Sequence, residues 1–235
     1  MKKSHTSKTV KYLYKNGIRL ICIDFDRTFI SIHTKGKWDK SAIKLTDYIR
    51  PVFINMIRTA VKKGISIAIV SFSPQEEIIR ECLNHYFQEY MDSIYIVTSN
   101  QKRNPKETFC KVNKDKLILK RKVPMILSLC NEIYKKTNKM ILPKNTLLID
   151  DDPMNIKIAN LSGFKTYLFN KYSEKKMLSD LLKKQDDPNT KPTTYTWVYA
   201  DTCKIILIMA VIVFLFWKDK NTTTMSSRLV TVKLQ

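Results

Sequence analysis

Two carboxylates and a hydroxyl stand close together near the start of the chain, in the run Asp24-Phe25-Asp26-Arg27-Thr28. Attack on a phosphate monoester needs a positioned nucleophile, a proton donor for the leaving oxygen and positive charge near the phosphoryl oxygens. Asp24 suits the nucleophile, and Asp26 can reach the leaving oxygen if the chain curls directly after Asp24. A Mg²⁺ ion bridging the Asp24 carboxylate, the Asp26 backbone carbonyl and a third acid would offset the repulsion between anions. Alone, the same pair also fits an ordinary polar turn.

The elements that must hold these acids follow from short apolar runs separated by helical patterns. Continuous apolar runs predict buried strands at 19–24, 65–70, 93–97, 146–150 and 165–169. Helices are expected at about 41–63, from Ser73, at about 124–137, and from Asp152 to Gly163, with Ser73 and Asp152 as N-caps. This alternation indicates an α/β fold, a Rossmann-like parallel sheet with helices on both faces.

The polar residues fall at one place relative to these strands. Asp24 and Asp26, Ser71, and Asp150 and Asp151 each follow or end a predicted strand. Ligands of parallel sheets bind beyond the carboxyl ends of the strands. We therefore expect these side chains to gather at one edge of the sheet, which a random scatter of surface acids would not do.

Four motifs in this order resemble those of the haloacid dehalogenase (HAD) superfamily over about residues 19–169. They are the apolar strand ending in D-x-D-x-T at Asp24, the apolar strand ending at Ser71, a lysine before a helix, and the apolar strand ending in Asp150-Asp151-Asp152. The first and fourth are specific, and the second and third are weak alone. The resemblance implies a phosphatase that forms an aspartyl phosphate and uses Mg²⁺.

Roles follow from the resemblance residue by residue. Asp24 corresponds to the nucleophile and Asp26 to the general acid and base, while Thr28 braces the loop next to the phosphate. Ser71 corresponds to a hydrogen-bond donor to a phosphoryl oxygen, although it also fits a strand-end cap. Lys122 corresponds to the cation that neutralises phosphoryl group and nucleophile.

Some assignments stay open at the level of sequence. Lys120 and Arg121 compete with Lys122, which we prefer because Val123 begins the next helix directly. Ser73 competes with Ser71, but suits the N-cap better.

In the acidic run the family pattern favours Asp151 as a metal ligand together with Asp24 and Asp26. Asp150 then supports it, and Asn155 replaces a frequent second acid.

Two weaker resemblances concern the substrate and the segment after the first motif. The run Ile149-Asp150-Asp151-Asp152-Pro153 is similar to that of small phosphatases acting on phosphoserine in the tail of RNA polymerase. The pattern His33-Thr-x-Gly36-x-Trp38 resembles a group of short proteins from microbial eukaryotes. His33 fits local packing or capping better than contact with substrate.

Composition and charge restrict the partners. Lys and Arg number 42 against 21 Asp and Glu, a formal charge of +21, which favours acidic partners or reflects a lysine-rich bias. No two of the five cysteines form a C-x-x-C pair, so a zinc site and a disulfide framework are not indicated. No apolar run follows Met1, so a secretory signal is not expected.

The chain divides into five predicted parts. These are a loose basic arm (1–17), the HAD-like phosphatase domain (18–184), a polar linker (185–196), a transmembrane tail anchor (197–217) and a short polar tail (218–235). The apolar run Ile205–Trp217 rises about 20 Å, short of the ~30 Å hydrocarbon core, and starting at Trp197 gives about 31 Å. A buried core segment is the alternative. The anchor would leave the catalytic domain in the cytosol; without it the protein is expected in the cytoplasm.

The room for a substrate-selecting cap is small, which favours a capless enzyme. A flap and one helix lie between Thr28 and Ser71, and the basic segment 98–122 occupies the other usual cap position. An open site with a basic rim favours a phosphorylated macromolecule, first of all a phosphoprotein. Phosphorylated nucleic acid or a phosphoinositide is less favoured, since Phe109 is the one aromatic residue of that segment. A catalytically silent, membrane-tethered binding module is the remaining alternative.

Overall fold

A five-stranded parallel sheet forms the centre of the protein. The computed structural model describes residues 3–100, 120–172, 174 and 176–183. The strands are β1 (Leu20–Ile23), β2 (Ser66–Val70), β3 (Ile94–Val97), β4 (Thr146–Asp150) and β5 (Lys165–Leu168). Their order in the sheet is β3-β2-β1-β4-β5. All five predicted strands are therefore present, and no strand end differs from the prediction by more than one residue.

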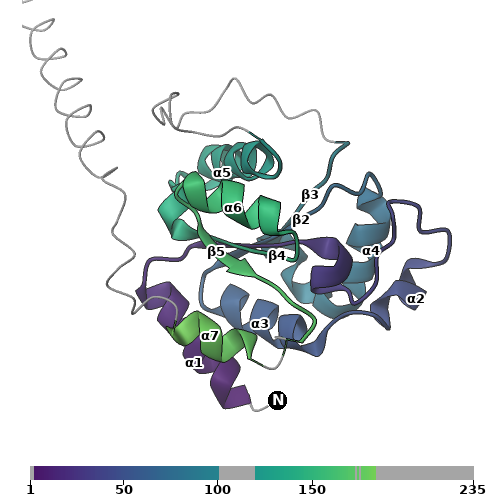
Figure 1. Ribbon diagram of the computed structural model, residues 1–235, viewed down its shortest axis with the longest axis horizontal. Coiled ribbons are helices and arrows are strands. Elements are labelled where there is room, and N and C mark those ends of the chain that lie inside the picture. The colour runs from purple at the N-terminus through teal and green to yellow at the C-terminus, as the bar shows by residue number, and fades with distance from the viewer. Residues whose placement is uncertain (1–2, 101–119, 173, 175, 184–235) are drawn as a thin grey trace, which may run out of the picture. The chain divides into compact units, whose positions relative to one another are not determined.

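Helices cover both faces of the sheet, as the apolar strands require (Figure 1). The helices are α1 (Lys3–Lys15), α2 (Ala42–Thr46), α3 (Pro51–Lys62), α4 (Glu76–Phe87), α5 (Val123–Thr137), α6 (Pro153–Leu161) and α7 (Met177–Lys183). On one face of the sheet, α1, α3, α4 and α7 pack into the larger core cluster with side chains such as Phe53 and Leu83. On the other face, α5 and α6 pack into a second cluster with side chains such as Leu127 and Ala159. Short turns of other helix types lie at η1 (Phe25–Phe29), η2 (Gln88–Ser93) and η4 (Pro143–Asn145). The predicted α/β architecture is confirmed.

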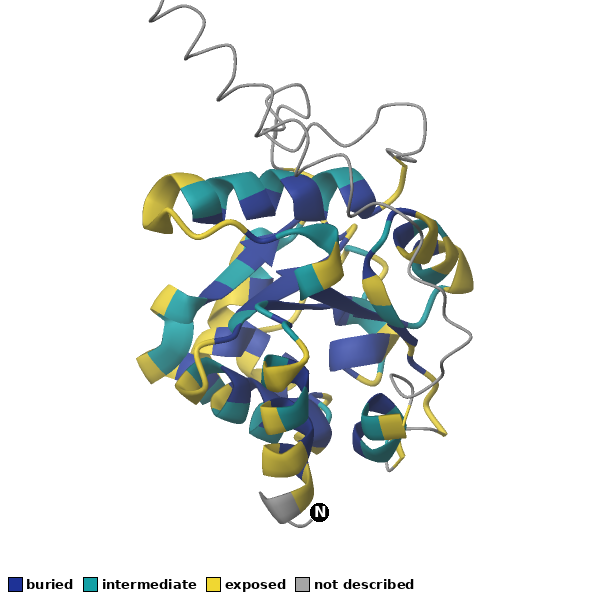
Figure 2. Cartoon of the chain, turned by 90° about the vertical axis from the view of Figure 1, so that its left-hand side faces the viewer, coloured by how far each residue is buried: buried dark blue, intermediate teal, exposed yellow. Residues whose placement is uncertain are grey.

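The N-terminal segment is a packed helix, so the prediction of a loose basic arm over 1–17 was wrong. In α1 the buried residues recur every three or four positions at Thr6, Thr9, Val10 and Leu13, and lysines occupy the exposed side. The Thr9 hydroxyl donates to the Leu178 carbonyl of α7 at 3.0 Å. This periodic face, although only weakly apolar, is thus enough for α1 to pack against the rest of the domain (Figure 2).

Two predicted helix boundaries were also wrong. The helix expected over 41–63 is two helices, because Arg50 is extended before Pro51, where proline disfavours helical backbone. The helix expected from Ser73 begins at Glu76, and the Ser73 hydroxyl instead accepts from the Gln75 amide at 3.2 Å. Asp152 does cap α6, since its carboxylate accepts from the Met154 amide at 2.7 Å.

Several predictions concern residues outside the described part of the chain. These are the linker 185–196, the segment 197–217 expected to span a membrane, the tail 218–235 and most of the basic segment 98–122. Among the described residues, none of the helices has the length and apolar character needed to cross a bilayer.

Candidate functional site

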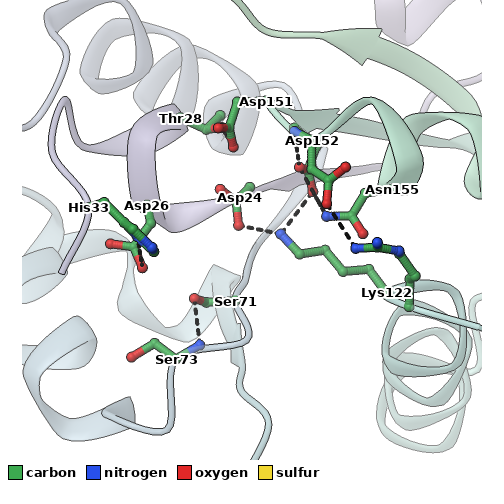
Figure 3. A network of polar contacts seen from close by, with 12 residues as sticks. Asp24, Asp26, Thr28, His33, Ser71, Ser73, Lys122, Asp151, Asp152 and Asn155 are labelled. Atoms are coloured by element: carbon green, nitrogen blue, oxygen red, sulfur yellow. Dashed lines mark hydrogen bonds and ion pairs between the residues drawn. The ribbon is translucent and has the colours of Figure 1, made fainter. Parts of the chain in front are cut away.

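The register of the sheet gathers the predicted polar residues at one edge. Ile23 of β1 pairs with Ile69 of β2 and with Ile149 of β4, so the strands end level with one another. The Asp24 amide continues the ladder and donates to the Ile149 carbonyl at 2.9 Å. Ser71 likewise donates its amide to Val97, at 2.9 Å. The expected convergence at the carboxyl ends of the strands is therefore present (Figure 3).

The chain curls directly after Asp24, as the chemistry of the D-x-D-x-T run requires. The Phe29 amide donates to the Asp24 carbonyl at 3.0 Å, and Arg27 adopts a left-handed conformation with φ of 61°. Arg50 fixes the curl from outside, because its guanidinium donates to the Thr28 carbonyl at 3.1 Å and to the Arg27 carbonyl at 3.4 Å. Sequence reasoning missed Arg50, since nothing near it in the chain indicates this contact.

Three carboxylates form the centre of the site. Oxygens of Asp24, Asp150 and Asp151 all lie within 4.8 Å of one another. The ammonium of Lys122 forms an ion pair with Asp24 and a second with Asp150 at 2.8 Å. The Lys122 side chain is 1% exposed, so water screens its charge little. The cluster therefore combines two buried acids, the half-buried Asp151 and one buried cation.

Lys122 is the basic residue that the fold brings to Asp24, among the three that the sequence left open. Arg121 adopts φ of 56° and turns outward, where its guanidinium pairs with Asp152 at 2.8 Å. Lys120 is exposed. Because Lys122 directly precedes α5, its side chain enters the site from the first turn of that helix.

Burial and charge shift the acid–base properties of the cluster. Burial raises the pKa of Asp24 from 3.8 to about 7; Lys122 opposes this rise, and the charges of Asp150 and Asp151 add to it. Burial alone would lower the pKa of Lys122, but Asp24 and Asp150 outweigh it and the net pKa is raised. Lys122 is therefore charged at neutral pH, and a further cation near Asp24 would favour its ionised form.

Asp150 and Asp151 differ in how many protein donors they already hold. Asp150 accepts from the Asp152 amide at 2.9 Å, from the Asn155 side chain at 3.0 and 3.1 Å, and from Lys122. Asp151 accepts from the Thr28 hydroxyl at 3.3 Å, and no other donor to it is found among the described residues. Asp151 therefore has free lone pairs for a metal ion, whereas most of those of Asp150 are already used. The expected roles of Asp151 as metal ligand and Asp150 as its support stay predictions.

Asn155 lies against this cluster as expected, but one of its atoms is unsatisfied. The residue is 4% exposed and its amide nitrogen is used by Asp150. Its Oδ1 atom is buried and accepts no hydrogen bond from the described residues. A buried oxygen without a donor suits an environment completed by water or by a cation.

Asp26 is not part of the acidic cluster. Its carboxylate is held by residues 31–40, called the flap below: the Thr34 amide and hydroxyl donate to it at 2.8 and 3.1 Å. His33 Nδ1 lies 3.3 Å from the same carboxylate. Figure 3 shows Asp26 beside His33, on the other side of Asp24 from Lys122. His33 thus contacts Asp26 within the same stretch of chain, which agrees with the local role expected for it. Thr34 also contacts Asp26, a role that the sequence analysis did not assign to it.

The loop after β2 contributes two further groups. Ser71 is 2% exposed, and its hydroxyl accepts from the Ser73 amide at 3.0 Å, which leaves the hydroxyl proton available for a ligand. Phe72 is 47% exposed, and the Lys122 ammonium lies 5.5 Å from the centre of its ring. An exposed ring at the mouth of a polar site was not expected from the sequence.

Comparison with known proteins finds likeness in structure alone. No family model and no curated protein sequence matches the chain. The HAD domain of the effector protein Lem4 from Legionella pneumophila is 15% identical at a TM-score of 0.44, with 72% of this chain and 96% of that chain covered. A HAD-superfamily hydrolase from Ehrlichia chaffeensis (14%, TM-score 0.38, 69% and 96% covered) and an uncharacterized protein from Corynebacterium glutamicum (14%, 0.39, 71% and 96%) are also similar. Two of these three are HAD proteins. Because the identities and TM-scores are this low, the functional site has to be argued from the side chains of this chain itself.

Proposed function

We propose that this chain is a HAD-type phosphatase that hydrolyses phosphate monoesters through an aspartyl phosphate on Asp24. The observation that carries the proposal is the buried ammonium of Lys122, which pairs with Asp24 and Asp150 beside Asp151 at the edge of the sheet. A nucleophilic carboxylate needs a fixed cation next to it to receive an anionic phosphoryl group. A purely structural acidic turn has no need of a buried lysine, whose desolvation is costly.

Two displacements at phosphorus complete the reaction. An oxygen of Asp24 attacks phosphorus, the bond to the leaving oxygen breaks, and Asp26 gives its proton to that oxygen. Asp26 then removes a proton from water, the water oxygen attacks phosphorus, and the bond to Asp24 breaks to release phosphate. Lys122 and the Ser71 hydroxyl bind phosphoryl oxygens throughout.

The donor set suits Mg²⁺. The Asp24 and Asp151 carboxylates lie close together, and with the Asp26 carbonyl they would offer the hard oxygen ligands that this ion prefers. Bound Mg²⁺ would supply positive charge that offsets repulsion between the phosphoryl group and Asp24. Asp150 and Asn155 would hold the ligands in place.

A phosphoprotein is the substrate we propose. Residues between Thr28 and Ser71 fold into the flap and into helices whose side chains, such as Phe53, belong to the core, so no cap domain is inserted there. A site without a cap, as we propose here, would admit a phosphate carried on a larger chain, and the excess of basic residues favours acidic segments around it. We further propose that residues 197–217 tether the enzyme to a membrane with this domain on the cytosolic side.

Turnover of p-nitrophenyl phosphate and of a phosphopeptide panel, with and without Mg²⁺, tests the function. We expect metal-dependent hydrolysis that Asp24→Asn abolishes. Asp92→Asn, at an exposed carboxylate of η2, serves as the matched control and should retain activity. Hydrolysis that persists in Asp24→Asn would refute the mechanism. Preference for nucleotides or inositol lipids over peptides would refute the proposed substrate class.

A further inference from the structure

The flap is fastened to the loop before α4 by a single side-chain amide. The Trp38 amide donates to Gln75 Oε1 at 2.7 Å, and Gln75 Nε2 donates to the Trp38 carbonyl at 2.8 Å. Because a backbone N–H only donates and a backbone carbonyl only accepts, this pairing determines which way the Gln75 amide points. Gln75 thus satisfies both backbone groups of Trp38, as a neighbouring strand would.

A close backbone approach supports the same attachment. Gly36 adopts φ of +67°, and a Cβ atom there would lie 2.9 Å from Cδ of Pro74, the residue next to Gln75. A side chain at this position would be strained and would also push the flap away from the loop. The flap therefore contacts the loop at Gly36 and at Trp38.

The other part of the flap holds Asp26. The Thr34 amide donates to Oδ1 of Asp26, and the Thr34 hydroxyl donates to Oδ2. The Gly36 amide in turn donates to the Thr34 hydroxyl at 3.3 Å. Thr34 therefore connects the Asp26 carboxylate to the stretch of chain that Gln75 and Pro74 hold. Among the described residues, Gln75 is the one whose side chain hydrogen-bonds both backbone groups of Trp38.

We propose that Gln75 is a positioning residue for Asp26, acting through Trp38 and Thr34 of the flap. This inference rests on the proposed function, in which Asp26 protonates the leaving oxygen. Gln75 contacts neither the acidic cluster nor the phosphoryl group in this scheme. Its loss should therefore impair proton transfer and leave attack by Asp24 intact.

Two substrates whose leaving groups differ in basicity can show whether Gln75 positions Asp26 or has only a general structural role. An alkyl phosphate needs protonation of its leaving oxygen, whereas p-nitrophenolate leaves without help. General acid catalysis contributes about 10²–10⁴-fold, so Gln75→Ala should lower kcat on a phosphoserine peptide by about tenfold or more. On p-nitrophenyl phosphate we expect less than about a twofold change.

Graded variants and an independent readout complete the test. Gln75→Glu keeps the acceptor for Trp38 and loses the donor, so its effect should lie between those of wild type and Gln75→Ala. Gly36→Ala should show the same dependence on leaving group. Glu77→Gln, at an exposed position of α4, is the control. Amide hydrogen exchange of the flap in the full chain should be faster in Gln75→Ala and unchanged in Glu77→Gln.

The outcomes are distinguishable. Equal loss on both substrates, or unchanged exchange of the flap in Gln75→Ala, would overturn the positioning role. Wild-type protein without metal-dependent turnover would overturn the proposed function and the catalytic role of Gln75 with it. Hydrogen exchange would still decide whether Gln75 holds the flap.

Discussion

Replacing Lys122 with methionine removes the cation of the buried cluster while keeping most of the side-chain volume. Lys122 is 1% exposed, and its partners Asp24 and Asp150 are 10% and 1% exposed at the side chain. Removing one partner of a buried ion pair costs about 3–5 kcal/mol, because the remaining charge is left uncompensated. Two carboxylates lose their partner here, so we expect a loss of at least about 3 kcal/mol in the free energy of unfolding at pH 8.

The same variant should show a specific dependence on pH. The pKa of Asp24 is already raised from 3.8 to about 7 with Lys122 opposing the rise, so removing Lys122 raises it further. A carboxyl with a higher pKa in the folded state binds protons that the unfolded chain has released, so stability falls as pH increases from about 4 upward. The deficit of Lys122→Met should therefore be smaller at pH 5 than at pH 8.

Urea unfolding followed by circular dichroism in EDTA measures both effects. Lys120→Met, at an exposed position two residues earlier, should change stability by less than about 0.5 kcal/mol. A loss below about 1 kcal/mol in Lys122→Met, or a deficit equal at both pH values, would refute the argument from the buried cluster. If the variant does not fold at pH 8, refolding at pH 5 remains the test.

Three other predictions concern separate parts of the protein. Asp24→Asn should stabilise the metal-free protein at pH 8 by roughly 2–4 kcal/mol, since it removes a charge whose pKa burial raises to about 7, while Lys122 keeps Asp150 as its charged partner. Thermal unfolding in EDTA would contradict this if the variant melted below wild type. Leu13→Ala in α1 should cost about 2–5 kcal/mol while Lys11→Ala costs little, and equal effects in urea unfolding would show that α1 does not pack. Phe72→Ala should raise KM for phosphopeptides with kcat retained, because the exposed ring lies at the mouth of the site; a fall in kcat alone would speak against a binding role.

Local signals in the sequence were sufficient for the sheet and for the positions of the acids. Each strand is a continuous apolar run, and parallel strands covered on both faces leave their carboxyl ends as the place for polar residues. Asp24, Ser71 and Asp151 were placed at that edge correctly on this basis. Asp152 was identified as a cap because the Asp-Pro pair acts within one turn of helix.

Helix boundaries and the packing of α1 were harder to predict from the sequence. Pro51 divides the expected helix 41–63, yet the periodicity of apolar residues continues across it. The buried face of α1 combines two threonines with Val10 and Leu13, too weak a pattern to identify without the helix it packs against. Whether such a face is buried depends on α3 and α7, which lie far away in the chain.

The sequence by itself determined that the chain forms a parallel α/β sheet and that Asp24 and the run of acids at 150–152 share one edge, because strand runs and their ends are local properties. Tertiary structure decided which base of three reaches Asp24, because the outward turn of Arg121 and the start of α5 direct Lys122 inward. It also decided that Asp26 lies against the flap, where Thr34 donates to its carboxylate and Gln75 binds Trp38, since no spacing in the sequence indicates these contacts.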